Sequence, residues 1–323
     1  MIRLILGRIV SSIPLIAGLI TIVFIIVRLL PGDPMTIYIS PAVPPAVAEQ
    51  LRAEFGFDRS IIHQYGQWMW GVMRGELGFS FTHQKDVARV IASAFPNTLI
   101  LAAVAILFQI IIGISLGLLA VRFHTSFIDK FVSVGGLIVY TLPSFWVAIL
   151  LLYIFSYSLG ILPSSQMHSI GADEFGKMEY LLDLLKHLIL PATVLGLPGA
   201  AAIARYLRTN LLDVLNEQFI LTARSMGLSE RKIFLSYALS NALIPTITIT
   251  GTTIGILLAG AVITETIFSW PGMGRLTVSA IFARDYPLII GCTLVAGTVV
   301  IVGNLLADIM YRIVDPRIRT GGL

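Results

Sequence analysis

Hydrophobic residues along this chain come in long runs that are separated by shorter polar stretches. A run of roughly 20 apolar residues can cross the hydrocarbon core of a bilayer as a helix, and six runs reach that length. We expect spans at residues 9–30, 97–121, 131–157, 187–206, 244–268 and 288–311. The pattern therefore predicts an all-α integral membrane protein with six transmembrane helices.

The spacing of the spans divides the chain unevenly. Residues 1–30 make a short N-terminus and the first helix, and the long 31–96 segment contains short helical patterns that predict a small helical segment outside the membrane. Residues 97–311 hold the other five helices with a polar loop at 207–243, and 312–323 form a tail. Basic residues precede the first run as in a signal peptide, but the run is long for one, so we expect an uncleaved helix.

Composition agrees with a membrane protein. Hydrophobic residues make up 56% of the 323 residues and charged residues only 12%, with a mean hydropathy of +0.89. Cys292 is the only cysteine, which excludes a disulfide framework and a thiolate metal site, and the five histidines are too scattered for metal ligation. A net charge of +4 is better explained by cytoplasmic loops than by nucleic-acid binding.

The distribution of Lys and Arg between the loops predicts the orientation. With the N-terminus inside, the cytoplasmic segments hold twelve basic residues, and the two short outer loops hold four, namely Lys177, Lys186, Arg275 and Arg284. Basic residues are enriched in short cytoplasmic loops, whereas long segments cross the membrane regardless of charge. We therefore expect a multi-pass protein with both termini in the cytoplasm and residues 31–96 outside.

Two stretches match catalytic patterns only superficially. "GADEFGKM" at 171–178 lacks the Ser or Thr that follows the lysine of a phosphate-binding loop, and the predicted topology places it outside the cell. "GISLG" at 113–117 matches a nucleophile elbow but lies inside an apolar helix, where small residues four apart favour helix packing. We expect no nucleotide-binding site and no enzymatic activity in this chain.

The polar loop contains a predicted helix-turn-helix. In "NEQFILTARSMG", Phe219, Ile220, Ala223 and Met226 fall on one face at helical spacing, and Gly227 stands where a left-handed residue ends a helix. Such a hairpin could rest on the protein's own spans or, alternatively, lie on anionic lipid.

A second helix follows directly in "SERKIFLSYALSNAL". Ser229 stands where it can cap this helix, and Ile233, Phe234, Tyr237 and Ala238 form one apolar face. Arg231 and Lys232 lie off that face, so the corner between the two helices is predicted to project into the cytoplasm.

The loop resembles the cytoplasmic loop of ATP-driven (ABC) importer permeases. "TARSMGLS" and "ALSNALIP" are similar to the peptide-and-nickel branch of that family almost throughout. The more general E-A-A-x3-G pattern is matched only at Ala223, Gly227 and Leu239. Further ordered resemblances cover nearly the whole chain: "LLPGDP", "FGFD", "RGELGFSF", "PNTLILA", "LPSFW", "FSWPGMGRL", "RDYPLI" and "DPRIR".

The resemblance implies a type I importer permease fold in the inner membrane of a bacterium. It also implies a second homologous permease subunit, two ATPase subunits that bind ATP and Mg, and an extracytoplasmic substrate-binding protein. This chain itself would bind no cofactor. The polar loop at 207–243 would contact an ATPase through residues Thr222, Ala223, Arg224, Gly227, Leu228 and Ser229.

Small residues in the fifth span suggest close helix packing. Gly251, Gly255 and Ala259 are spaced four apart, which makes a smooth face for a neighbouring helix. This face could meet the partner permease or another helix of the same subunit, and the spacing favours neither.

Polar and helix-breaking residues inside the spans are candidates for the transport pathway. Pro143 in the third span removes a backbone hydrogen bond, and Glu265 is ionisable in an apolar setting, where such groups tend to face cavities or partners. Asn304 and Asp308 share a face of the sixth span. A partly hydrated helix end is the alternative for that pair.

The implied substrates are di- or oligopeptides, with nickel or a metal chelate as the alternative within the same architecture. "QYGQWMW" and "SAIFARDYP" lean slightly toward nickel. A single-chain secondary transporter or an intramembrane enzyme is a more distant alternative. The first would favour internal symmetry and the second a catalytic constellation, and the sequence offers neither.

Overall fold

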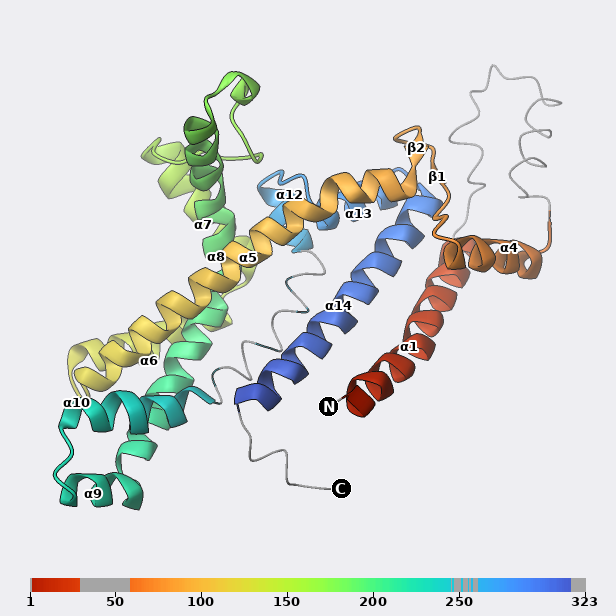
Figure 1. Cartoon of the computed structure of the whole chain (residues 1–323). Coiled ribbons are helices and arrows are strands. Elements are labelled where there is room, and N and C mark those ends of the chain that lie inside the picture. The colour runs from red at the N-terminus through yellow and green to blue at the C-terminus, as the bar shows by residue number, and fades with distance from the viewer. Residues whose placement is uncertain are drawn as a thin grey trace. The chain divides into compact units, whose positions relative to one another are not determined.

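The computed structural model describes residues 2–29, 59–244, 246, 251, 255, 257 and 261–314. Most of these residues are helical (Figure 1). The α-helices are α1 (Ile2–Leu29), α4 (Ile61–Met73), α5 (Val87–Arg122), α6 (Phe127–Thr141), α7 (Ser144–Leu151), α8 (Lys177–Leu215), α9 (Gln218–Ser225), α10 (Glu230–Lys232), α12 (Val262–Ile267), α13 (Met273–Phe282) and α14 (Tyr286–Val314). The other elements are the π-helices η1 (Leu152–Ser158) and η3 (Ile233–Leu239), the 3-10 turn η2 (Ala172–Glu174), and strands β1 (Phe79–Ser80) and β2 (Lys85–Asp86).

The chain forms two compact units. The first comprises residues 1–97 and 271–298, and the second comprises 98–270 and 299–323. The predicted boundary at 96/97 lies inside α5, which begins at Val87, because Pro96 is accommodated within the helix. The polar loop that we predicted at 207–243 also starts later in the structure than expected, because α8 continues to Leu215.

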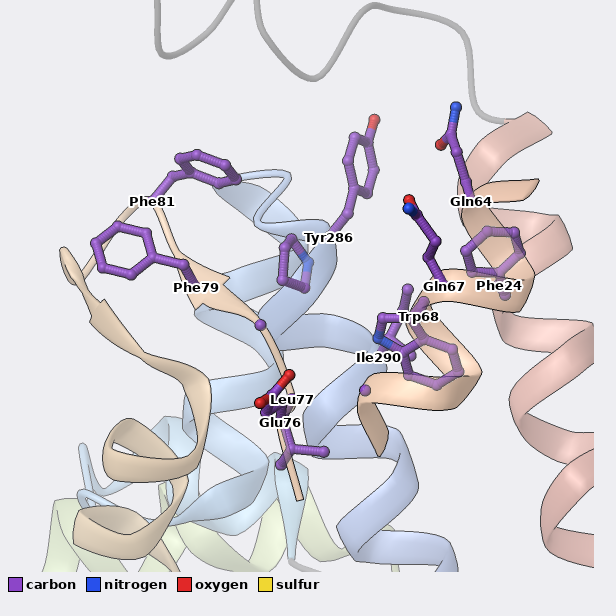
Figure 2. Close-up of a pocket in the computed structure, with 13 residues that line it drawn as sticks. Phe24, Gln64, Gln67, Trp68, Glu76, Leu77, Phe79, Phe81, Tyr286 and Ile290 are labelled. Atoms are coloured by element: carbon purple, nitrogen blue, oxygen red, sulfur yellow. The ribbon is translucent and has the colours of Figure 1, made fainter. Parts of the chain in front are cut away.

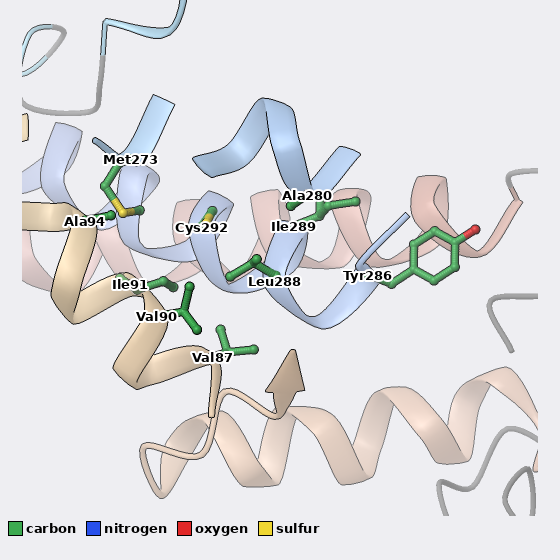
Figure 3. Packing of buried hydrophobic residues seen from close by; sticks show 10 residues of the cluster. All are labelled: Val87, Val90, Ile91, Ala94, Met273, Ala280, Tyr286, Leu288, Ile289 and Cys292. Carbon is green, nitrogen blue, oxygen red and sulfur yellow. The ribbon is translucent and has the colours of Figure 1, made fainter. Parts of the chain in front are cut away.

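The core of the first unit is a hydrophobic cluster between the start of α5, α13 and the start of α14. Figure 3 shows that the α5 side chains enter this cluster from one side. Cys292 is buried in it, as expected for a small apolar side chain. The buried members are Val87, Val90, Ile91, Ala94, Met273, Ala280, Tyr286, Leu288, Ile289 and Cys292.

A two-stranded hairpin stands immediately before α5. Strands β1 and β2 pair antiparallel, with Phe79 opposite Asp86 and Ser80 opposite Lys85. The hairpin is fixed by the buried Asp285, whose Oδ2 accepts a hydrogen bond from the Ser80 hydroxyl at 2.6 Å and from the Thr82 N–H at 3.1 Å. This small sheet was not predicted, because two-residue strands leave no period in the sequence.

Helix α5 packs closely against α8 in the second unit. A Cβ added at Gly113 would lie 2.7 Å from the Cβ of Ile203, and one at Gly117 would lie 3.0 Å from the carbonyl oxygen of Ala204. Real Cβ atoms do not reach the first distance, so only glycine allows this approach. The helix-packing interpretation of "GISLG" is confirmed.

The predicted third span is broken rather than continuous. Helix α6 ends at Thr141, Leu142 is extended, and Pro143 caps α7, with a bend of 106° between the two segments. Proline lacks an N–H and pushes the preceding residue toward extended conformations, so the helix cannot continue through Leu142. The prediction of one helix over 131–157 with Pro143 in its interior is wrong.

Within the described residues, three helices are long and apolar enough to cross a membrane, and the bent pair makes a fourth if it is one span. They are α5, α8 and Tyr286–Ala307 of α14. In α1 the described apolar stretch is Val10–Ile26. The predicted fifth span lies largely outside the described residues, and Ala261 within it is not helical. Six spans remain a prediction.

Candidate functional site

The predicted helix-turn-helix is present in the second unit as α9, α10 and η3, which we call the corner (residues 218–239). Figure 1 shows α9 and α10 beyond the end of α8. Helix α9 ends as expected at a glycine, since Gly227 has a φ of +73° and its N–H donates to the carbonyl of Arg224 at 2.9 Å. The Leu228 N–H donates to the carbonyl of Ala223 at 3.3 Å, which completes the cap.

A Cβ added at Gly227 would meet no atom of this chain within 4 Å. The glycine is therefore required by its left-handed backbone and not by crowding within the subunit. This is the geometry of a corner whose tip is open to another molecule.

The corner is held to α8 by a hydrophobic cluster. Ile220 and Ala223 of α9 and Ile233 and Ala238 of η3 are buried against the end of α8, where Leu207 and Leu211 are also buried. Ile233 and Ala238 are five residues apart, which is the spacing of a π-helical hydrogen bond, and both are buried. The predicted apolar face of the second helix is confirmed, although its helix type was not foreseen.

The apolar face predicted for the first helix is only half right. Ile220 and Ala223 are buried, but Phe219 and Met226 are 41% and 72% exposed, and the neighbouring Leu221 is 54% exposed. Only Ile220 and Ala223 of α9 are buried in the cluster with α8. The remaining apolar side chains form an outward surface, which is typical of a site that another protein covers.

An exposed ion pair braces the tip of the corner. The Arg224 guanidinium donates from two nitrogens to the two carboxylate oxygens of Glu230, at 2.9 and 3.2 Å. These hydrogen bonds from Arg224 hold the pKa of Glu230 below its usual value. Ser229 occupies the N-cap position of α10, but its hydroxyl makes no capping hydrogen bond, so that expectation is wrong.

Arg208 is a structural residue and not a free loop cation. It lies on α8, and its guanidinium makes a bidentate hydrogen-bonded contact with the buried carboxylate of Asp129 in the first turn of α6. His124 and the Thr125 N–H also contact that carboxylate, at 3.2 and 3.0 Å. Together, and chiefly through Arg208, these groups hold the pKa of Asp129 well below its usual value.

Sequence reasoning missed Asp129, although a local signal marks it. Ser126 is the N-cap of α6 and accepts a hydrogen bond from the Asp129 N–H, so the "SFID" stretch is a capping motif with an acidic residue three positions on. That signal could have located the helix start. It could not have named Arg208 as the partner, because the two are 79 positions apart.

The small residues of the fifth span contact α14 of the same chain. A Cβ on Gly251 would lie 3.0 Å from the Cβ of Ala307, and one on Gly255 would lie 3.1 Å from Oδ1 of Asn304. Ala259 lies outside the described residues. The close approach that the spacing predicted is thus made within the subunit, and these two glycines give no support to a partner interface.

Glu265 does not face a cavity. Its side chain is fully buried, and its Oε1 accepts a hydrogen bond from the Thr98 hydroxyl at 2.9 Å. A carboxylate with no accessible surface cannot line a pathway in this conformation, so its place among the pathway candidates is corrected. Asn304 is exposed on α14, and the side chain of Asp308 lies outside the described part of the structure.

The first unit contains a hollow of about 310 Å³ whose lining includes the aromatic side chains of Phe24, Trp68, Phe79, Phe81 and Tyr286 (Figure 2). Trp68 stacks on Phe24 with ring centroids 6.1 Å apart, and Tyr65 bonds the Thr21 hydroxyl at 2.7 Å. Trp70 is exposed beneath the guanidinium of Arg74. Trp68 instead packs inside the unit.

Comparison with known proteins identifies two family models in this chain. Residues 109–320 match the binding-protein-dependent transport system inner membrane component, and residues 1–102 match its N-terminal counterpart. Solved structures of the MetNI methionine ABC transporter in inward-facing conformations align with TM-scores of 0.51 and 0.52 at 16% identity, covering 70% of this chain and 96% of theirs. That likeness shows the fold alone.

Several curated relatives match over nearly their whole length. A putative peptide permease protein of Brucella suis is 39% identical over 99% of both chains. The oligopeptide transport system permease protein AppB of Bacillus subtilis is 38% identical over 97% of this chain and 98% of its own. The dipeptide transport system permease protein DppB of Escherichia coli is 37% identical over 99% of both.

Proposed function

Because the chain belongs to the family of binding-protein-dependent transport system inner membrane components, we propose that it is the permease subunit of an ABC importer for peptides. The observation that carries the substrate class is the 37–39% identity, over nearly the full length, to permeases named for peptides, oligopeptides and dipeptides. Nickel import, the alternative that two sequence stretches suggested, is not favoured by these relatives. A secondary transporter or an intramembrane enzyme is not favoured by the family.

The family implies partners that bind and hydrolyse ATP and a binding protein that delivers substrate. We propose two ATPase subunits and a second, homologous permease. This chain would bind neither ATP nor Mg. We further propose six spans with both termini in the cytoplasm and residues 31–96 outside.

The corner is the surface that we assign to an ATPase. Phe219, Leu221 and Met226 are exposed apolar side chains on a segment whose opposite face is packed against α8. Exposed apolar side chains beside a braced turn suit a protein partner better than solvent. A movement of an ATPase at this corner would act directly on α8, which is one of the apolar helices long enough to span the membrane.

Uptake in cells tests the proposed function. Strains that lack this gene should accumulate a radiolabelled dipeptide or oligopeptide much more slowly than the parent, and the gene supplied in trans should restore uptake. Uptake of radioactive nickel, measured in the same strains, should not change. Loss of nickel uptake with normal peptide uptake would contradict the proposal and support the alternative.

A further inference from the structure

A second hollow in the first unit has a different character from the aromatic one. It has a volume of about 750 Å³ and lies between residues 83–97 and residues 271–279, and we call it the basic groove. Its walls are the end of the hairpin, the first turns of α5 and the start of α13. The volume falls within the range of small-molecule sites, which is about 300–1,000 Å³.

The polar lining of the basic groove is predominantly cationic. Lys85, Arg89 and Arg275 line it together with His83, and no carboxylate is among the lining residues. Arg89 contacts Asp86 at 3.2 Å, but both side chains are more than half exposed, and such a pair is weak. A carboxylate that entered the groove could therefore compete for Arg89.

The rest of the lining is apolar or neutral. Val90, Ala94 and Leu276 form an apolar part, and Val90 and Ala94 belong to the buried cluster of Figure 3. Ser93 and Ser279 supply hydroxyl groups beside them. Besides its N-terminal ammonium group, a short peptide presents a carboxylate, amide groups and variable side chains, and these three suit such a lining.

The basic groove is held in place by hydrogen bonds on two sides. Asp285 fixes the hairpin through Ser80 and Thr82, which positions the residues at the start of α5. The Asn97 side-chain amide donates to the carbonyl of Pro271 at 2.9 Å and ties α5 to the segment before α13. The cations are thus carried by elements that are already fixed, which lowers the entropic cost of binding a ligand.

We propose that the basic groove binds the C-terminal carboxylate of the peptide during its entry into the importer. This proposal rests on the proposed function. Peptides of different sequence share only their backbone and their two termini. A permease that accepts many sequences can therefore recognise little besides these shared groups. Arg guanidinium and Lys ammonium groups are the usual partners of carboxylates, and Arg can bind both oxygens at once.

The test uses the complete importer in proteoliposomes, with partner permease, ATPases and binding protein. The binding protein is loaded with one labelled peptide or with the same peptide as its C-terminal amide, and loading is verified for both. We compare the wild type with Lys85→Gln, Arg275→Gln and the double variant. All three carry exposed substitutions, so folding should be preserved.

At saturating loaded binding protein, the double variant should carry the free-acid peptide about tenfold more slowly than the wild type, as expected for a lost charge-assisted hydrogen bond. Uptake of the amide should be unchanged, and the KM for loaded binding protein should stay within about twofold. Lys177→Gln, an exposed lysine outside the groove, is the matched control and should behave as the wild type.

Two results would overturn the proposal. A raised KM for loaded binding protein with a normal saturated rate would make the groove a docking surface for that protein instead. Equal loss of acid and amide uptake, or no loss, would show that the groove does not read the carboxylate. Failure of the proposed function itself is separate, because wild-type proteoliposomes would then carry no peptide at all.

Discussion

The corner in the second unit and the basic groove in the first are both rich in Arg and Lys, but they use these residues differently. Next to the corner, Arg208 is matched by the buried Asp129, and at its tip Arg224 is matched by Glu230. In the basic groove, Lys85 and Arg275 line a hollow that contains no carboxylate. A cation paired with a buried carboxylate of the same chain, as Arg208 is, fixes a shape, whereas several cations that line one hollow can bind a ligand together.

The first way to break this comparison is to remove the buried carboxylate that pairs with Arg208. Asp129→Ala leaves the Arg208 guanidinium without its partner in a largely buried position, and losing one member of such a pair costs about 3–5 kcal/mol. We expect a large drop in the thermal unfolding temperature of the purified protein in detergent.

Asp86→Ala is the matched control, because it breaks the exposed pair with Arg89, and we expect it to change stability by less than about 0.5 kcal/mol. Because the pKa of Asp129 lies below its unfolded value, the pair's contribution should be constant from pH 8 down to about 5 and should fall in stronger acid. Equal effects of the two alanine variants would contradict the distinction.

A second prediction separates the two faces of α9. Ile220→Ala creates a cavity in the cluster against α8 and should cost about 2–4 kcal/mol of stability. Leu221→Ala, one position on, removes an exposed side chain and should cost less than about 0.5 kcal/mol.

Thermal unfolding and recovery of the ATPase by co-purification would measure both effects. Leu221→Ala should keep the fold and weaken co-purification. If the ATPase were retained fully by Leu221→Ala, the exposed apolar surface would not be the contact that we assign.

The smallest expected effect is on the stability of the first unit. Lys85→Gln and Arg275→Gln are exposed, and each should change the unfolding temperature by less than about one degree, since surface substitutions seldom exceed about 0.5 kcal/mol. A large destabilisation by either variant would mean that these cations are structural, as Arg208 is, and that the contrast between the two regions does not hold.

The corner could be predicted from the sequence because its determinants are local. A glycine after a short amphipathic helix, followed by a second apolar face, was enough to place α9, the left-handed cap at Gly227 and the buried Ile233 and Ala238. The long helices followed from hydrophobic runs in the same way. The bend at Pro143 is also local, but a proline in an apolar run does not by itself distinguish a break from a continuous helix, since Pro191 and Pro198 lie inside α8.

The features that the sequence did not reveal depend on distant pairs. The Thr98–Glu265 hydrogen bond joins residues 167 positions apart, and Ser80–Asp285 joins residues 205 apart. The basic groove likewise needs the start of α5 and the start of α13 together. The periodicity of hydrophobic residues along the sequence carries no information on such distant contacts. For that reason Glu265 was interpreted as a pathway residue, and the basic groove was not predicted.

The central claim, that the corner couples ATP hydrolysis to transport, is tested most directly by Gly227→Val. A β-branched residue at φ +73° strains the backbone by roughly 1–2 kcal/mol, but it meets no atom of this chain, so the subunit should insert and assemble with its partner permease. Gly171→Val is the control, because Gly171 also has a positive φ and open space around it.

The measurement is peptide uptake and binding-protein-stimulated ATPase activity in the reconstituted importer. We expect Gly227→Val to lose most of both, either because the ATPases bind weakly or because they no longer respond to the loaded binding protein, and Gly171→Val to keep both. Full uptake and full stimulation in Gly227→Val would contradict the account and favour a hairpin that rests on lipid.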